Sequence, residues 1–285
     1  MSISPTPPPS PVEALTVPAT GRPPVADRAP VLNFFLDAVI GLATLLVVSV
    51  GTAALWGIWR SFELMRQARA QGLPADPHAI MSAIGQPGVL AQMLMALAST
   101  SSAALLLYFW RRRASAPERS RSHAAALRPS TWGWAVLVAV LVFILSNVIG
   151  WLAESLGIKP VPTNLAMVDQ GLREWPVFLA IFAVVLAPAS EELLFRRVLF
   201  GRLLAAGRPW LGLVMSSVAF ALLHEIPGLS GNGPLAIVQL WLVYGGMGAA
   251  FAWLYWRTGT LWASVLGHGL HNGIALAALY LFGMQ

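Results

Sequence analysis

Glu191-Glu192-Leu193-Leu194-Phe195-Arg196 is a charged stretch that directly follows one apolar run and directly precedes another. The two runs predict a membrane-spanning helix, in which each charged side chain at the centre costs about 2.5–3.5 kcal/mol. Charges that are kept at this cost normally have a function. On a helix, Glu192 and Arg196 are four residues apart and share a face, so they can pair. Glu191 is rotated by about 100° from Glu192 and can point elsewhere, which makes it the candidate for chemistry.

The composition of the chain is that of a polytopic membrane protein. Of its 285 residues, 57% are hydrophobic and 11% are charged, whereas soluble domains carry about 25% charged residues. The net charge of +6 comes almost entirely from arginine. We attribute it to the positive charge of cytoplasmic membrane loops rather than to nucleic-acid binding. The chain has no cysteine, which excludes disulfides, thiol catalysis and thiolate metal sites.

Three regions divide the chain. Residues 1–30 are rich in proline, serine and threonine and have no apolar periodicity, so we interpret them as a disordered tail. The tail lacks the basic-then-apolar order of a signal peptide, and we expect it to be retained. Residues 31–170 hold the N-terminal transmembrane helices, and residues 171–285 hold the motifs that carry the chemistry.

The fold is predicted to be all-α, a polytopic transmembrane bundle of about seven spanning helices. A spanning helix needs about 17–25 mostly apolar residues. The polar segments 60–86, 111–131 and 154–174 are predicted as loops, the first with room for a short amphipathic helix. The predicted spans are 33–59, 89–110, 132–153, 175–204, 209–225, 234–256 and 261–282.

The placement of arginine predicts the orientation of the spans. The segment from Arg111 to Ser130 is the most basic, so we expect it in the cytoplasm together with the N-terminus. The loops 154–174 and 225–233 then lie outside. The segment 60–87 is an exception, because its arginines would also lie outside; if it is re-entrant, the number of spans changes by one. Arginine in place of lysine and abundant alanine suggest a GC-rich bacterial genome, and we expect the protein in the bacterial inner (plasma) membrane.

Polar groups return in two later apolar segments. Phe220 and His224 are four residues apart and share one helix face, as do His268 and Asn272. His271 lies beside that second face, and we assign it no role. Three segments thus carry polar groups that a bilayer would otherwise reject. They form either a buried network that only locks helices together or an active site.

The three motifs together resemble those of the CPBP family, the CAAX-processing and bacteriocin-processing (Abi-like) intramembrane proteases. They are Glu-Glu-x-x-x-Arg at 191–196, Phe-x-x-x-His at 220–224 and His-x-x-x-Asn at 268–272. Eukaryotic members of this family are the type II CAAX prenyl endopeptidases. The resemblance implies an endopeptidase in the lipid bilayer, with a water-accessible cavity, that cleaves a membrane-associated protein or peptide and binds no nucleic acid.

The resemblance also implies a role for each motif residue. Glu191 would be the general base that activates a water, and His224 would help to hold that water. His268 and Asn272 would donate hydrogen bonds to the tetrahedral oxyanion, each typically worth about 2.7–4 kcal/mol in the transition state. Three further residues would support the motifs: Glu192, Arg196 and Phe220.

A metal ion is the open question of this interpretation. Glu191, His224 and His268 form a two-histidine, one-carboxylate set that could hold zinc. The His-Glu-x-x-His signature of zinc proteases is absent, because Pro227 follows His224-Glu225 and would interrupt a continuing helix. We expect catalysis without a metal cofactor, with zinc held by these three residues as the alternative.

Two other functions are compatible with the residues. A non-catalytic member of the same fold could act as a membrane scaffold or immunity protein, and a transporter could use the intramembrane carboxylates. A scaffold has no need of Asn272 opposite Glu191. A transporter would predict inverted repeats, and no internal repeat is apparent.

Helix rise gives a geometric test of the proposed site. Glu191 lies roughly 16 Å along the helix axis from Arg202, and His268 lies roughly 16 Å from Arg257. Both arginines are expected at the cytoplasmic side. By the same measure, His224 lies roughly 24 Å from Arg208. His224 is thus predicted to lie about 8 Å deeper than Glu191, too far for contact unless its helix starts early, tilts or sits lower.

Overall fold

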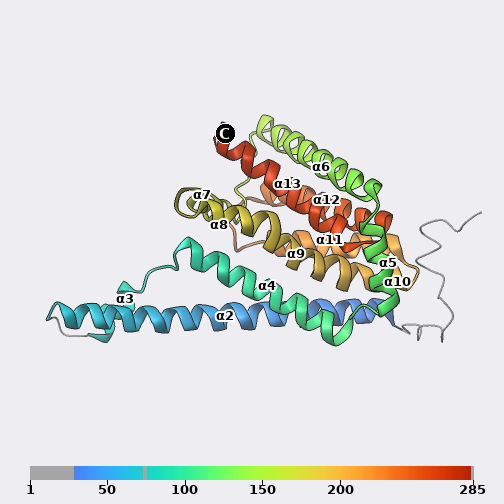
Figure 1. Cartoon of the computed structure of the whole chain (residues 1–285). Coiled ribbons are helices and arrows are strands. Elements are labelled where there is room, and N and C mark those ends of the chain that lie inside the picture. Colours follow the sequence, from blue (N-terminus) through green and yellow to red (C-terminus); the bar gives the residue numbers. More distant parts are fainter. Residues whose placement is uncertain (1–28, 73–75, 284–285) are drawn as a thin grey trace, which may run out of the picture.

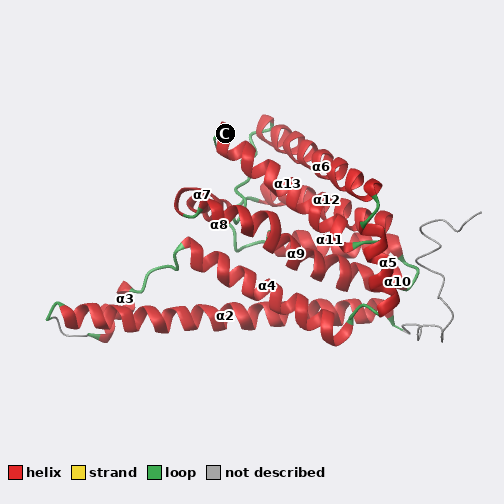
Figure 2. Cartoon of the chain, viewed as in Figure 1, coloured by secondary structure: helices red, strands yellow, loops and turns green. Residues whose placement is uncertain are grey.

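The computed structural model describes residues 29–72 and 76–283 (Figure 1). Within these ranges every regular element is helical, and no strand occurs (Figure 2). The predicted all-α class is therefore confirmed. Residues 1–28 of the predicted tail lie outside the described ranges, and the first helix begins at Pro30.

Six helical stretches within the described residues are long and apolar enough to cross a membrane. A further apolar helix, α11, has only 16 residues. It is about 24 Å long, shorter than a hydrocarbon core of about 30 Å. The polytopic bundle is confirmed, with one short helix in place of the fifth predicted span. The six stretches are α2 (Pro30–Ala70), α4 (Val89–Arg111), α6 (Pro129–Ser155), the composite span Pro176–Ala205, α12 (Pro234–Thr258) and α13 (Leu261–Phe282), and α11 covers Pro209–His224.

The composite span is not a regular α-helix. It consists of α8 (Pro176–Ile181), the π-helical η1 (Phe182–Leu186), α9 (Ala187–Glu192), the π-helical η2 (Leu193–Phe200) and α10 (Gly201–Ala205). π-Helical turns are rare and occur mostly at functional sites. Here one precedes and one follows the short α-helix that ends in the two glutamates.

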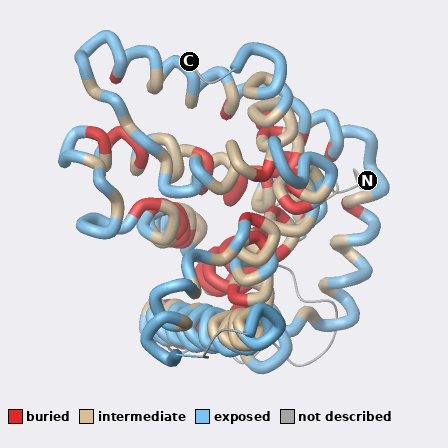
Figure 3. The backbone as a smooth tube through the Cα atoms, turned by 90° about the vertical axis from the view of Figure 1, so that its left-hand side faces the viewer, coloured by how far each residue is buried: buried red, intermediate tan, exposed pale blue. Residues whose placement is uncertain are grey.

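The composite span lies at the centre of the bundle. It packs against α4 on one side and against α11 and α13 on the other, while α2 runs beside α4 (Figure 1). Buried residues gather in the interior, and the outward faces are exposed (Figure 3). The largest apolar cluster draws on α2, α4, α6, the composite span, α11, α12 and α13. This arrangement surrounds the glutamates with protein.

The first helix is longer than predicted. The predicted end at residue 59 is wrong, because α2 continues without a break to Ala70 and has 41 residues. Between residues 60 and 70 the chain contains no glycine or proline and is rich in good helix formers. Gly72, with a φ of 71°, follows the end of the helix, as is common after a C-cap. The far end of α2 and the short α3 (Pro77–Ala83) project beyond the rest of the bundle (Figure 1).

Two segments predicted as loops contain helices. In the basic segment 111–131, α5 (Ala116–Ala126) starts with a capping box of Ser115 and Glu118, a pattern that is readable in the sequence. Glu118 also pairs with Arg197 of η2. Burial acts to raise the pKa of Glu118, but hydrogen bonds from Arg197 and Ser115 outweigh it and lower the pKa to about 2. In the segment 154–174, the amphipathic α7 (Leu165–Glu174) packs against α4 and α8.

A buried ion cluster joins the N-terminal helices to the composite span. Asp37 of α2 is fully buried. Its carboxylate accepts hydrogen bonds from Arg202 of α10 at 2.6 Å and from Arg111 at the end of α4. A buried carboxylate loses its hydration and needs such partners. Asp37 therefore links three helices that lie far apart in the sequence.

Replacing Asp37 with alanine is expected to lower the free energy of unfolding by about 3–5 kcal/mol, because it removes the carboxylate between two arginines. Thermal and denaturant unfolding of the purified protein in detergent would measure the loss. The matched control is Glu63→Gln, which removes a partly exposed pair with Arg60 and should cost less than about 1 kcal/mol. Equal losses in both variants would contradict the assigned role of Asp37.

Candidate functional site

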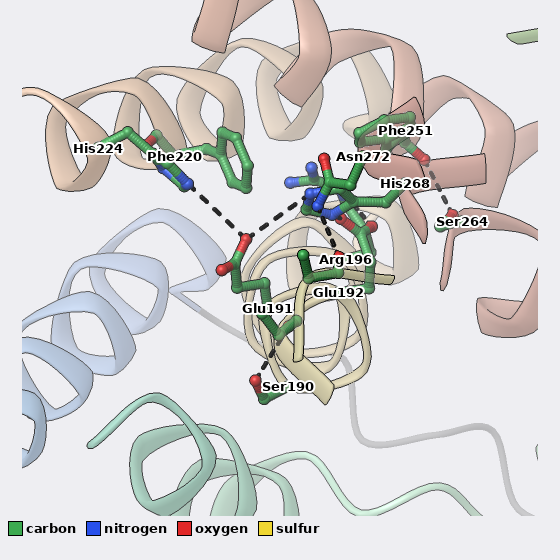
Figure 4. A network of polar contacts seen from close by, with 12 residues as sticks. Ser190, Glu191, Glu192, Arg196, Phe220, His224, Phe251, Ser264, His268 and Asn272 are labelled. Carbon is green, nitrogen blue, oxygen red and sulfur yellow. Dashed lines mark hydrogen bonds and ion pairs between the residues drawn. The ribbon is translucent and has the colours of Figure 1, made fainter. Parts of the chain in front are cut away.

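Three elements bring the predicted polar residues to one place (Figure 4). Glu191 lies in the last turn of α9, His224 is the last residue of α11, and His268 lies on α13. Oε2 of Glu191 is 3.8 Å from Nε2 of His224 and 4.0 Å from Nε2 of His268. The carboxylate thus faces both imidazole rings.

The predicted difference in depth between Glu191 and His224 is wrong. It assumed that Arg202 and Arg208 mark the same level of the membrane. Arg202 is buried and bonded to Asp37, whereas Arg208 is exposed and follows it by six residues. The two reference points therefore lie at different levels, and the offset between them accounts for the predicted mismatch.

Both imidazole rings are held through Nδ1. Nδ1 of His224 lies 2.8 Å from the carbonyl oxygen of Phe220, and Nδ1 of His268 lies 3.0 Å from Oε1 of Glu192. A carbonyl and an ionised carboxylate only accept hydrogen bonds, so Nδ1 of each ring must donate. Each neutral ring then leaves Nε2 as an acceptor.

The site therefore places three acceptor atoms around one space. Nε2 of His224 and Nε2 of His268 both face Oε2 of Glu191, which is buried and has no hydrogen-bond partner within the described chain. A buried acceptor without a donor is unfavourable. A water molecule, a proton or a cation would satisfy such a set, and a water held here would contact a candidate base.

Aromatic rings of α12 support both histidines, which the sequence interpretation missed. The centroid of the His224 ring lies 4.8 Å from that of Tyr244 on α12 and 4.2 Å from that of Phe220 on its own helix, α11. His268 stacks on Phe251 at 4.9 Å with an angle of 19° between the planes. Tyr244 and Phe251 are seven residues apart on α12, which is about two turns. This repeat was the signal that could have identified them.

The ion pair predicted from the four-residue spacing is present. Nε of Arg196 lies 2.9 Å from Oε2 of Glu192, and both side chains are fully buried. The guanidinium lies 4.9 Å from the ring centroid of Phe220, close enough for a cation–π contact. Because Glu192 also contacts His268, one carboxylate links the first motif to the third.

Asn272 contacts the composite span through its side-chain amide. Nδ2 of Asn272 donates to the carbonyl oxygen of Ala183 at 2.9 Å. In η1 the N–H of Ala187 bonds to Phe182, so the carbonyl of Ala183 would pair next with residue 188. That residue is Pro188, which has no N–H. Asn272 supplies the missing donor.

Gly269 allows this contact. A Cβ at Gly269 would lie 2.2 Å from the carbonyl oxygen of Val184. This distance is a steric clash, so any residue with a side chain is excluded unless the backbone moves. The backbone of α13 therefore approaches η1 directly, one turn before Asn272. The glycine spacing at 269 and 273 serves packing within this chain, as expected for small residues in membrane helices.

The spacing of the three candidate metal ligands differs from that of a formed zinc site. Two imidazoles and a carboxylate are suitable donors, but ligand atoms with zinc bonds of about 2.0–2.2 Å lie about 3.4 Å from one another. The distances here are 3.8 and 4.0 Å. Within residues 29–72 and 76–283, no three His, Asp or Glu side chains form a group that could hold a metal ion. The donor types suit zinc, whereas their observed arrangement does not.

Glu192 should matter more for stability than for chemistry. Glu192→Gln is expected to lower the free energy of unfolding by about 3–5 kcal/mol, because Arg196 would keep a buried charge without its counterion. Thermal unfolding in detergent would measure this. The double variant Glu192→Leu/Arg196→Met removes both charges and should recover much of the loss. If it is less stable than the single variant, the pair is not what stabilises this region.

Several known proteins are similar to part of this chain. The chain is 26% identical over 145 residues to the putative membrane peptidase YdiL of Bacillus subtilis, covering 49% of this chain and 54% of that protein. It is 30% identical over 154 residues to the membrane-embedded CAAX protease MroQ of Staphylococcus aureus, covering 50% and 56%. The chain thus spans about half the length of the curated relatives it matches. No solved structure matches it.

The family comparison agrees with the three motifs. A family model described as "Type II CAAX prenyl endopeptidase Rce1-like" matches residues 173–274. The matched region contains the glutamate pair, both site histidines and Asn272. This region of the chain is therefore similar to the Rce1-like CAAX proteases.

Proposed function

We propose that this protein is an intramembrane endopeptidase that hydrolyses a peptide bond of a membrane-associated protein or peptide. The observation that carries the proposal is the convergence of Glu191, His224 and His268 on one space. The side chains of Glu191 and His224 are 19% and 23% exposed. Both residues are thus partly exposed, whereas Oε2 of Glu191 itself is buried, so the proposed water is one held inside the site.

In the proposed reaction, Glu191 is the general base. A water in the shared space donates one hydrogen to Oε2 of Glu191 and is oriented by Nε2 of His224. Glu191 accepts the proton as the water oxygen attacks the peptide carbonyl, which forms a tetrahedral oxyanion. The protonated Glu191 then returns the proton to the departing amine, and the C–N bond breaks. The base is restored and no other reactant is needed.

His268 and Asn272 are the proposed donors to the oxyanion. Nε2 of His268 can donate only when both ring nitrogens carry a hydrogen, with Nδ1 donating to Glu192. Asn272 has two amide hydrogens, and Ala183 takes one of them. The other can serve the oxyanion. Fixed donors of this kind act by being in place before charge develops.

The proposed reaction needs no metal. Zinc is the alternative cofactor, and Glu191, His224 and His268 would hold it after a small contraction of the site. One relative is named as a membrane-embedded CAAX protease, which supports a membrane-associated protein as substrate. The distribution of arginine supports an N-terminus in the cytoplasm and, with a bacterial source, insertion in the inner membrane.

Glu191→Gln keeps the shape of the side chain but cannot take a proton from water at neutral pH. We expect turnover to fall by about 10²–10⁴-fold while the protein stays folded and inserted. Quantitative proteomics of new N-termini in membrane fractions would compare wild type with this variant. Glu154→Gln, at an exposed carboxylate, is the matched control. Unchanged cleavage in Glu191→Gln would remove this mechanism and leave a scaffold or an unrecognised site.

The same membrane fractions and the purified protein distinguish catalysis without a metal from catalysis with bound zinc. Exhaustive chelation should leave cleavage unchanged, and elemental analysis should find far less than one zinc per chain. A zinc enzyme would instead lose activity, and variants of Glu191, His224 and His268 would lose the metal together. Stoichiometric zinc that disappears in His224→Ala would overturn the metal-free reaction but not the family assignment.

Asn272→Ala should lower turnover by about 10²–10³-fold with little change in substrate binding, because its second hydrogen acts mainly in the transition state. Asn272→Asp should be at least as harmful, since a carboxylate would repel both the oxyanion and the carbonyl of Ala183. Kinetics on a cleaved peptide would separate kcat from KM. Activity of Asn272→Asp equal to wild type would exclude this role.

A further inference from the structure

Glu225 is a buried carboxylate that directly follows His224 and has no part in the reaction above. Its side chain is inaccessible to solvent, and its hydrogen-bond partners are neutral. Oε2 accepts from Oγ1 of Thr163 at 2.7 Å. Oε1 accepts from Ser230 and, at 3.2 Å, from Nδ2 of Asn232.

The backbone around Glu225 belongs to the same network. The carbonyl of Glu225 accepts from Nε1 of Trp241 at 2.9 Å, and the carbonyl of His224 accepts from Thr163 at 3.3 Å. Asn232 also exchanges two hydrogen bonds with the backbone of Val161, at 2.9 and 2.8 Å. The network therefore ties together the segment 158–164, the segment 225–233 and α12.

The shortness of α11 explains why such a network is needed here. The last four carbonyls of a helix have no partner within it. Since α11 is shorter than the hydrocarbon core, its C-terminal end lies at membrane depth when the other end is at the surface. Irregular backbone is tolerated there only where protein or a water-filled cavity satisfies it. The donors around Glu225 meet this requirement at the residue next to His224.

We propose that Glu225 is a positioning residue that holds His224 in the orientation in which Nε2 faces Glu191. The carboxylate gathers donors from two segments and so fixes the end of α11. Every hydrogen-bond partner of its side chain lies in the segments 158–164 and 225–233, which separates this role from that of a second base. The kinetic consequence rests on the proposed function, whereas the structural consequence does not.

Two substitutions at Glu225 separate positioning from proton transfer. In Glu225→Ala the donors lose their common acceptor, and we expect kcat to fall by about 10–100-fold with KM nearly unchanged, as for small misplacements of a catalytic group. In Glu225→Gln the amide oxygen can accept from Ser230 and Asn232, and the amide nitrogen can donate to Oγ1 of Thr163. This variant should recover kcat to within about threefold of wild type.

Histidine-selective ¹⁵N NMR in detergent micelles reads the position of His224 without any substrate. The signals of His224 are assigned by their loss in His224→Ala. In wild type and Glu225→Gln they should report a protonated Nδ1. In Glu225→Ala they should shift or broaden while those of His268 stay in place. If the protein cleaves nothing, this measurement alone decides the proposal.

Controls distinguish positioning from a general loss of stability. Asp37→Ala should lower stability without moving the His224 signals, since Asp37 lies at the α2–α10 contact. If Glu225→Ala does not fold, Thr163→Val removes the donor shared by Glu225 and His224 and should shift the same signals less strongly. Unchanged His224 signals in these variants would overturn the proposal. So would a Glu225→Gln protein as inactive as Glu225→Ala, because that would require a proton-transferring carboxylate.

Discussion

The architecture of the site depends on one fully buried carboxylate, that of Glu192. It pairs with Arg196 one turn along the composite span and contacts His268 on α13. A buried charge pair is stable only when the remaining donors and acceptors are also satisfied, and the ring of His268 meets part of that need. The carboxylate of Glu192, which neutralises Arg196 inside the membrane, therefore also fixes the ring of His268 that faces Glu191. Stability and site geometry share the same atoms.

A second constraint comes from Pro188. Its missing N–H leaves the carbonyl of Ala183 without a helical partner, and Asn272 fills that place. Gly269 makes the contact sterically possible. Asn272 thus has a structural partner whatever its part in catalysis, so a loss of activity on its replacement has two candidate causes. The proline, the glycine and the asparagine form one unit across two helices, at the π-helical turn η1 that precedes α9.

Local rules predicted much of this from the sequence. Helical periodicity identified the Glu192–Arg196 pair and the shared faces of the other two motifs, and hydropathy identified the bundle. What failed depended on longer-range facts. Estimating the depth of a residue in the membrane requires a residue of known level as reference. Arg202 was a wrong reference because it is buried against Asp37, 165 residues away in the sequence. Tyr244 and Phe251 carry no charge, so their seven-residue spacing was a weak signal until their packing against the histidines was seen. The orientation in the membrane and the roles of the site residues stay predictions, and the tail lies almost entirely outside the described residues.

Exposure within the site differs between the residues proposed to act and those proposed to support them. Glu191 and His224 are 19% and 23% exposed, whereas His268 is 4% exposed and Glu192 and Arg196 are fully buried. The proposed reaction needs water at Glu191, whereas the charges of Glu192 and Arg196 are kept away from water and lipid. α11 ends at His224, and the segment 225–233 follows it. The Glu225 network then supplies donors to the carbonyls of His224 and Glu225, which no continuing helix is there to pair.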